Sequence, residues 1–143
     1  MLKESLSASK IRDILNKKAG MTVAYNLEEE NPSDVTDWIP TGSRWLDSIT
    51  ATGRLGGIPV GKISEIAGLE STGKSYLAAQ VAANAQRKGI VVVYFDSENA
   101  LDSSFLKRAG CDVTNLIYTQ AKSIEYVFES IETLLKDTEQ KYL

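Results

Sequence analysis

Histidine is absent from this sequence and cysteine occurs once, which removes several kinds of catalytic and metal site. Without histidine a Ser-His-Asp triad cannot form, and a zinc site is disfavoured because zinc is usually held by cysteine and histidine. Cys111 has no second cysteine with which to form an internal disulfide, which fits a reducing cytosol. We therefore expect a protein that works without disulfides, zinc or histidine-based catalysis.

Long apolar runs and an excess of basic residues are also missing. No stretch approaches the ~20 apolar residues of a membrane span, and the N-terminus lacks the apolar region of a secretory signal. Lys and Arg number 16 and Asp and Glu number 19, for a net charge of -3. That charge offers no bulk attraction for nucleic acid, and no cluster of Lys and Arg indicates a phosphate-contacting surface. We expect a soluble, cytoplasmic protein without a membrane partner.

The composition of the 143 residues is otherwise ordinary for a globular protein, but it changes near residue 37. Apolar residues spaced by three to five predict a short amphipathic helix before residue 19: Leu2, Leu6, Ile11, Ile14 and Leu15. Residues 21–37 are acidic, contain Asn31-Pro32 and are expected to form a connector. We therefore predict an N-terminal helix with an acidic linker over residues 1–37 and a folded core over residues 38–143.

Within this core the pattern alternates between strands and helices. A capping segment at 41–43 favours a helix over 44–49 that would bury Trp45 and Leu46. Further strands are predicted at 62–67, 90–96 and 115–120, and further helices at 75–88, 102–109 and 124–135. The strand at 90–96 is apolar at nearly every position, which is typical of a strand buried on both faces in a parallel sheet. This order predicts an α/β fold with right-handed crossovers.

The segment "GLESTGKS", Gly68–Ser75, matches the pattern G-x-x-x-x-G-K-[ST] between a predicted strand and a predicted helix. Its glycines, Gly68 and Gly73, let the backbone curl so that N–H groups point at phosphate oxygens. The helix N-terminus adds partial positive charge at the same place. Lys74 would reach the β- and γ-phosphates, and the Ser75 hydroxyl would ligate Mg²⁺. The alternative is a glycine-rich strand-to-helix turn that matches the pattern by chance.

Two carboxylates close the predicted strand at 90–96, where ligands bind in open α/β sheets. Asp96 ends the strand and Glu98 follows it. Hydrolysis needs a carboxylate that orients or deprotonates the attacking water, and Glu98 is our candidate for this base. Asp96 could instead be a structural strand terminus, and Asp102 could cap the next helix.

Three stretches together resemble the RecA family of recombinases, including its phage UvsX-type members. The first is "IPTGSRWLDSITATGRLGGIPVGKISEIAG", which leads into the glycine motif. The second is the motif itself, in which Glu70 is a family-like detail that a generic phosphate loop does not require. The third is "YFDSENALDSSFLKRAGCDVTNLIYTQ", which contains the family-like core D-x-E-x-A-L-D. The resemblance extends over roughly Ile39 to Leu135.

The resemblance implies ATP and Mg²⁺ as cofactors and gives roles to single residues. Glu98 would be the catalytic glutamate that activates water, with Lys74 as the second catalytic residue and Ser75 on the metal. Phe105 falls where members stack an aromatic ring on adenine, with a buried core phenylalanine as the alternative, and Gln120 falls near the nucleotide. The predicted nucleotide-binding set is Gly68, Leu69, Glu70, Ser71, Thr72, Gly73, Lys74, Ser75, Tyr76, Asp102 and Phe105.

The resemblance also implies a RecA-like P-loop NTPase core with a mostly parallel sheet and flanking helices. Residues 38–143 would hold only part of it, because "KYL" at 141–143 looks like the start of a fourth strand. In the family, that strand carries the Walker B aspartate, and the loops that bind single-stranded DNA come later. The chain is therefore predicted to be the N-terminal part of an ATP-dependent DNA recombinase, acting in the cytoplasm of a bacterium or a phage-infected host.

Two alternatives accompany this prediction. The N-terminal helix resembles the family element that packs on the neighbouring subunit of a filament, but it could also fold back on its own domain. The function could be that of another RecA-fold ATPase, such as a helicase, although Glu70 and the "SENALD" stretch speak against it. It could also be that of a nucleotide-binding or subunit-docking module without turnover.

Overall fold

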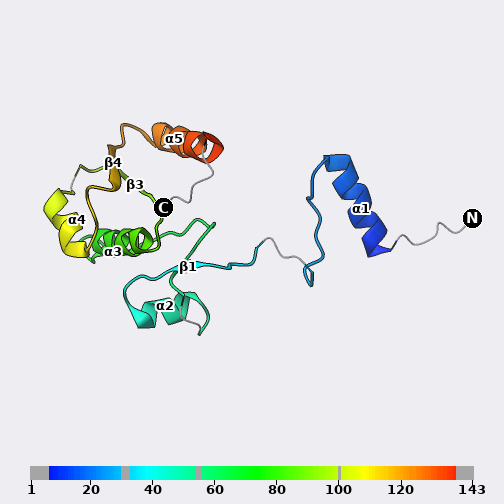
Figure 1. Ribbon diagram of the computed structural model, residues 1–143, viewed down its shortest axis with the longest axis horizontal. Coiled ribbons are helices and arrows are strands. Elements are labelled where there is room, and N and C mark those ends of the chain that lie inside the picture. Colours follow the sequence, from blue (N-terminus) through cyan, green and yellow to red (C-terminus); the bar gives the residue numbers. More distant parts are fainter. Residues whose placement is uncertain (1–6, 30–32, 54–55, 100, 138–143) are drawn as a thin grey trace, which may run out of the picture. The chain divides into compact units, whose positions relative to one another are not determined.

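The computed structural model describes residues 7–29, 33–53, 56–99 and 101–137. The chain forms two compact units, an N-terminal unit (Met1–Val35) and a C-terminal unit (Thr36–Leu143) (Figure 1). The described residues contain five α-helices and two small sheets, so the chain is mixed α/β. Among them, no helix has the length and apolar character needed to cross a membrane.

The N-terminal unit is built on the helix α1 (Ala8–Ala19), whose ends follow the expected capping chemistry. Ser7 accepts a hydrogen bond from the backbone of the first turn, and Gly20 ends the helix in the left-handed region at φ +68°. The Asn16 side chain then bonds to the backbone at residues 23 and 24. These bonds fold the segment after the helix back against it.

The apolar stripe of α1 is exposed. Ile11, Ile14 and Leu15 are 46%, 54% and 47% exposed, and no residue of the helix is buried. Leu2 and Leu6, which belong to the same predicted stripe, lie outside the described residues. The helix itself is confirmed, and its apolar side chains leave an uncovered surface on the N-terminal unit.

The C-terminal unit begins with a short antiparallel pair around one helix. β1 (Trp38–Ile39) pairs with β2 (Ile58–Pro59), and α2 (Arg44–Thr50) lies between them in the chain. Ser43 caps α2 by accepting a hydrogen bond from the Leu46 backbone N–H. The predicted helix at 44–49 is therefore confirmed.

The predicted burial of Trp45 is wrong, because α2 turns a different face inward. Trp45 is 82% exposed and Leu46 is half-buried, whereas Asp47 is 6% exposed. The Asp47 carboxylate accepts hydrogen bonds from both the backbone N–H (2.8 Å) and the hydroxyl (2.7 Å) of the fully buried Thr41. Residues two apart on a helix point about 200° apart. Fixing Asp47 inward therefore turns Trp45 outward.

We expect Asp47→Ala to lower the free energy of unfolding by about 1–3 kcal/mol, because it leaves buried donors of Thr41 without their acceptor. Urea denaturation followed by circular dichroism measures this change. Trp45→Ala on the same helix is the control and should change stability by no more than about 0.5 kcal/mol, as an exposed position does. A larger loss for Trp45→Ala than for Asp47→Ala would contradict the packing described here.

The central part of the C-terminal unit has two parallel strands between helices (Figure 1). β3 (Val92–Asp96) pairs in parallel with β4 (Leu116–Gln120), with Val92 opposite Leu116 and Asp96 opposite Gln120. α3 (Lys74–Arg87) packs on one face of β3, and α4 (Ser103–Ala109) packs against α3. These bounds agree with the predicted elements within two residues.

The core lies between α3 and the face of the sheet that carries the even-numbered residues of β3. Its apolar members are Ile39, Ala79, Val81, Ala82, Ala83, Ala85, Ile90, Val92, Leu106, Ala109 and Cys111. Alanines on α3 let the helix approach the strands closely, and Cys111 donates a weak hydrogen bond to the Ala79 carbonyl (3.2 Å). Cys111 is thus a packing residue, and burial raises the pKa of its thiol.

The predicted strand at 62–67 is absent from both sheets, and this prediction is wrong. Its residues are exposed, with Ile63 fully so. A groove of about 290 Å³ is lined both by this segment, at Ile66, and by β3, at Val92 and Tyr94. Because a strand needs a hydrogen-bonded neighbour, the apolar pattern alone does not produce one here.

The last described helix, α5 (Ile124–Asp137), lies over the other face of the β3–β4 pair. Ser123 caps it by accepting a hydrogen bond from the Tyr126 backbone N–H. The spacing of its apolar residues is that of a core-facing helix, but Ile124 and Phe128 are 67% and 62% exposed, and the helix contains no buried residue. A two-stranded sheet is too narrow to cover the helix. The predicted fourth strand at 141–143 lies outside the described residues.

Candidate functional site

The glycine loop, defined here as Gly68–Gly73, is an exposed turn that leads directly into α3. Ser71 and Gly73 both have positive φ, +59° and +91°. The Thr72 hydroxyl donates to the Leu69 carbonyl (2.7 Å), which closes the loop on itself. Alternating left-handed residues turn successive backbone N–H groups toward a common centre, which is the geometry of an anion-binding nest.

Lys74 lies across this loop. Its ammonium donates hydrogen bonds to the carbonyls of Gly68 (2.9 Å) and Leu69 (2.7 Å). These carbonyls hold the positive charge over the loop, in the place where the sequence predicted contact with phosphate. An arriving phosphate could take over these hydrogen bonds without a large movement of the lysine.

The N-terminus of α3 suits a phosphate because no side chain caps it. Gly73 occupies the N-cap position and makes no side-chain hydrogen bond. The N–H groups of the first helical turn have no acceptor within a helix, and the helix dipole adds positive potential there. The residues present therefore fit a phosphate group held by the loop, the first turn of α3 and Lys74.

Ser75 is exposed in the first turn of α3 and is the predicted metal ligand. Among the described residues, no group of three or more His, Cys, Asp and Glu could hold a metal ion. A magnesium ion that keeps most of its waters needs few protein ligands when phosphate oxygens complete its shell. The Ser75 hydroxyl fits that limited role.

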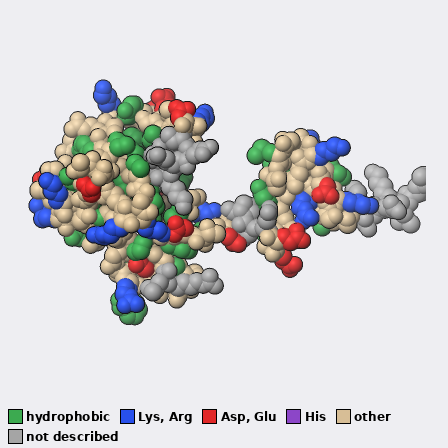
Figure 2. Space-filling view, viewed as in Figure 1, with side chains coloured by type: hydrophobic (Ala, Val, Ile, Leu, Met, Phe, Trp, Pro, Cys, Tyr) green, Lys and Arg blue, Asp and Glu red, His purple; other side chains and the backbone are tan. Residues whose placement is uncertain are grey.

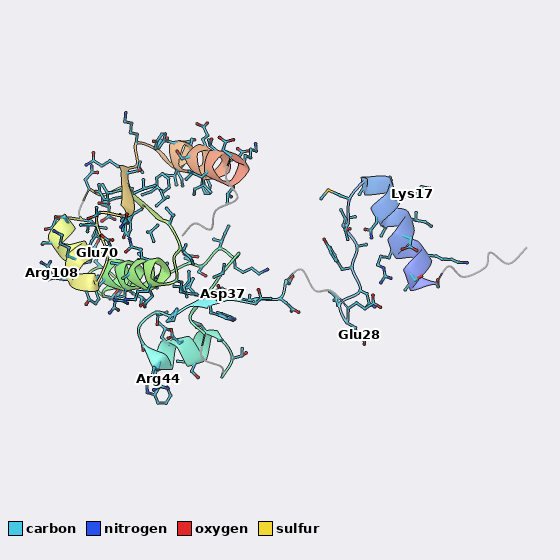
Figure 3. The ribbon with its side chains drawn as sticks, viewed as in Figure 1. Lys17, Glu28, Asp37, Arg44, Glu70 and Arg108 are labelled. Carbon is cyan, nitrogen blue, oxygen red and sulfur yellow. The ribbon has the colours of Figure 1, made fainter. Side chains whose placement is uncertain are left out.

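The lengths of α3 and of the segment after it carry the end of β3 back toward the end of α3 that follows the glycine loop. The 14 residues of α3 span about 21 Å, and the extended segment 90–96 returns about the same length in the opposite direction. The Tyr76 and Phe105 rings meet edge to face with centroids 6.0 Å apart, which ties the first turn of α3 to α4. In Figure 3, Glu70 of the loop and Arg108 of α4 lie at this same end of the C-terminal unit.

The three predicted carboxylates at this end differ in their surroundings. Asp96 is 7% exposed and accepts hydrogen bonds from the Tyr118 hydroxyl (2.8 Å) and from the backbone N–H groups of Glu98 (3.0 Å) and Leu101 (3.1 Å). Burial alone would raise the pKa of Asp96, but these hydrogen bonds outweigh it and hold the pKa below its ordinary value. Asp96 is thus a structural strand terminus, the alternative that the sequence left open.

Glu98 and Asp102 are both exposed. The Glu98 side chain accepts no hydrogen bond within the part of the chain that the structure describes, so its carboxylate can face a ligand or water. Asp102 caps α4 by accepting from the Phe105 backbone N–H (2.6 Å) and the Ser104 hydroxyl (2.8 Å), which lowers its pKa. These are the bonds of a helix cap, which is the alternative that the sequence left open for Asp102.

Tyr118 is the residue that sequence reasoning missed. It pairs with Tyr94 in the parallel register, so its side chain lies on the same face of the sheet as Tyr94 and Asp96. The only available signal was alternation along two strands, and alternation cannot give the register between them. Gln120, the predicted residue near the nucleotide, is exposed and pairs with Asp96 at the end of the same ladder.

A glycine loop before an uncapped helix, beside a strand that ends in carboxylates, is typical of α/β proteins that bind phosphate groups. Residues 6–140 match the family profile described as RecA N-terminal domain, and the chain belongs to this family. Protein RecA of Aquifex aeolicus is 50% identical over 121 residues, which are 85% of this chain and 34% of that protein.

Two further relatives carry the same name. Protein RecA of Wolinella succinogenes is 47% identical over 107 residues, 75% of this chain and 30% of that protein. Protein RecA of Ureaplasma parvum is 42% identical over 113 residues, 79% of this chain and 33% of that protein. The chain therefore spans about a third of the length of the relatives it matches.

Proposed function

We propose that this chain is the N-terminal part of an ATP-dependent DNA recombinase, and that its glycine loop holds the phosphates of ATP. The observation that carries the proposal is the Lys74 ammonium, held at 2.9 and 2.7 Å from two loop carbonyls in front of the uncapped N-terminus of α3. The glycine loop and the first turn of α3 thus offer a phosphate both a positive charge and backbone N–H groups. A phosphate is the ligand that such a combination binds best.

In the proposed mechanism, the glycine loop, Lys74, Ser75 and Glu98 have separate tasks. Bound Mg-ATP supplies the γ-phosphoryl group that water attacks. The loop N–H groups and Lys74 orient and neutralise the phosphates, and Ser75 provides a hydroxyl ligand for the metal. The Glu98 carboxylate, exposed just beyond β3, orients the attacking water and takes its proton.

The adenine base is proposed to bind beside Phe105, which is half-buried and meets Tyr76. We expect Phe105→Leu, which keeps apolar volume but removes the aromatic ring, to weaken ATP binding by about tenfold, because base stacking contributes about 1–3 kcal/mol. Titration with ATP and with inorganic tripolyphosphate measures both parts of the site. Tripolyphosphate should bind as before. An equal loss for the two ligands would mean that Phe105 only supports the fold.

The remaining activities are proposed for the longer protein. On the face shown in Figure 2, Lys and Arg side chains are scattered among acidic and apolar ones, which favours DNA contact through other regions. We propose that the N-terminal unit docks on a neighbouring subunit of a filament through its exposed side chains Ile11, Ile14 and Leu15. Homologous pairing and strand exchange would follow from such a filament in the cytoplasm.

A chimaera tests the proposal as a whole. This chain would replace the matching third of Protein RecA from Aquifex aeolicus, and ATP hydrolysis would be measured with and without single-stranded DNA. We expect hydrolysis that DNA stimulates. ATP binding without hydrolysis would instead favour a nucleotide-binding or subunit-docking module, a second candidate that the exposed apolar faces of α1 and α5 support.

A further inference from the structure

The Asp96 carboxylate connects β4 to the segment that carries Glu98. One of its oxygens accepts from the Glu98 backbone N–H, and the other accepts from the Tyr118 hydroxyl and the Leu101 backbone N–H. The backbone carbonyl of Asp96 also accepts from Ala121, just past the end of β4 (3.1 Å). One buried residue thus bonds to the Glu98 segment and to the neighbouring strand.

The bonds to Asp96 are the main support that the structure shows for the segment that carries Glu98. Asn99 has φ +53°, a left-handed conformation that asparagine adopts more readily than most residues with a side chain. Residues 97–99 are exposed and belong to no helix or strand, so apolar packing does not fix them. The bonds to Asp96 are therefore what orders the turn on which Glu98 stands.

Tyr118 fixes Asp96 in turn. It stands on the neighbouring strand, two residues before Gln120, and its hydroxyl reaches the carboxylate across the sheet face at 2.8 Å. A hydrogen bond to a charged group contributes more than one between neutral groups. The Tyr118 hydroxyl therefore limits the directions in which the Asp96 carboxylate can point.

We propose that Asp96 and Tyr118 are positioning residues that hold Glu98 in place for catalysis. The proposal rests on the proposed function, because it takes Glu98 as the group that activates water. Neither residue needs to touch the nucleotide. They act through the backbone N–H of Glu98, which fixes the position of the backbone from which the exposed carboxylate extends.

Amide hydrogen exchange on the isotope-labelled chain tests the positioning directly and needs no nucleotide. Tyr118→Phe should speed exchange of the Glu98 and Leu101 amides by about tenfold, the effect of losing one hydrogen bond to a carboxylate. Tyr94→Phe is the matched control, because it removes a hydroxyl from the partner residue in the same register. It should leave both amides unchanged. Asp96→Asn should give the larger acceleration, and Tyr118→Phe keeps the test decisive if that variant fails to fold.

Kinetics in the chimaera provide the second readout. Tyr118→Phe should lower kcat for ATP about tenfold and leave KM unchanged, because binding of the phosphates does not depend on Glu98. Unchanged exchange at Glu98 and Leu101 overturns the inference whether or not ATP is hydrolysed. Faster exchange with an unchanged kcat also overturns it. If the unsubstituted chimaera hydrolyses no ATP, the proposed function fails. The exchange data then still report whether Tyr118 and Asp96 hold the Glu98 segment, because they do not depend on hydrolysis.

Discussion

Lys74→Ala is expected to weaken ATP binding by about a hundredfold or more and to stop turnover. The substitution removes an ammonium that already lies 2.9 and 2.7 Å from the loop carbonyls and is placed to meet the phosphates. Two charge-assisted hydrogen bonds contribute about 1.5 kcal/mol each or more, and 1.4 kcal/mol corresponds to a factor of ten. Isothermal titration calorimetry with Mg-ATP measures the loss.

The loop itself should survive this change, because the Lys74 side chain bonds only to exposed carbonyls. Circular dichroism should therefore show an unchanged fold. Lys107→Ala, which removes an exposed positive charge from α4, is the control for net charge and should bind ATP normally. Equal affinity of Lys74→Ala and the unsubstituted chain would remove the glycine loop from nucleotide binding.

Glu98→Gln is expected to leave ATP binding within about twofold and to lower the hydrolysis rate by about 10²–10⁴, the range for loss of a general base. The amide introduced by this substitution keeps the shape of the side chain but cannot accept a proton from water. The backbone N–H at this position would still donate to Asp96, so the turn should remain ordered. The chimaera with Aquifex aeolicus sequence provides the rate measurement.

The control for Glu98→Gln is Glu129→Gln, which changes an exposed glutamate of α5. It makes the same chemical change away from the candidate site and should leave hydrolysis unaltered. If both variants hydrolyse ATP at the rate of the unsubstituted chimaera, the base lies elsewhere. If Glu98→Gln loses binding along with turnover, Glu98 has a role in holding the ligand.

The sequence predicted elements that depend on local signals. Asp102 and Gly110 fix the ends of α4, and Ser123 begins α5, because capping depends on residues within one turn. The strand after α3 was also predictable, since a short run of β-branched residues follows a helix that ends at a glycine in the left-handed region. Such features require no knowledge of distant partners.

Features that depend on distant partners could not be predicted. Burial of Asp47 depends on Thr41, whose own burial comes from the packing around β1, so the outward turn of Trp45 had no local signal. The segment 62–67 has an apolar pattern, but whether it forms a strand depends on a neighbour. At the candidate site, the loop followed from its motif, whereas the bond between Asp96 and Tyr118 required the register of two strands.

The exposed apolar faces favour association of the chain. Large apolar side chains are exposed on α5, at Ile124 and Phe128, and on α2, at Trp45. β3 is hydrogen-bonded to β4 along one edge, and it also lines an open groove. Exposed apolar patches and unpaired strand edges favour association. We therefore expect the chain to associate as its concentration rises.

The most direct test of phosphate binding by the glycine loop is a titration of the isotope-labelled chain with Mg-ATP, followed by amide chemical shifts. We predict that the largest changes fall on Gly68–Tyr76 and that Lys74→Ala removes them, because the loop and the first turn of α3 supply the phosphate contacts. Millimolar Mg-ATP that leaves the amides of Gly68–Tyr76 unmoved, or that shifts them equally in Lys74→Ala, would contradict this central claim.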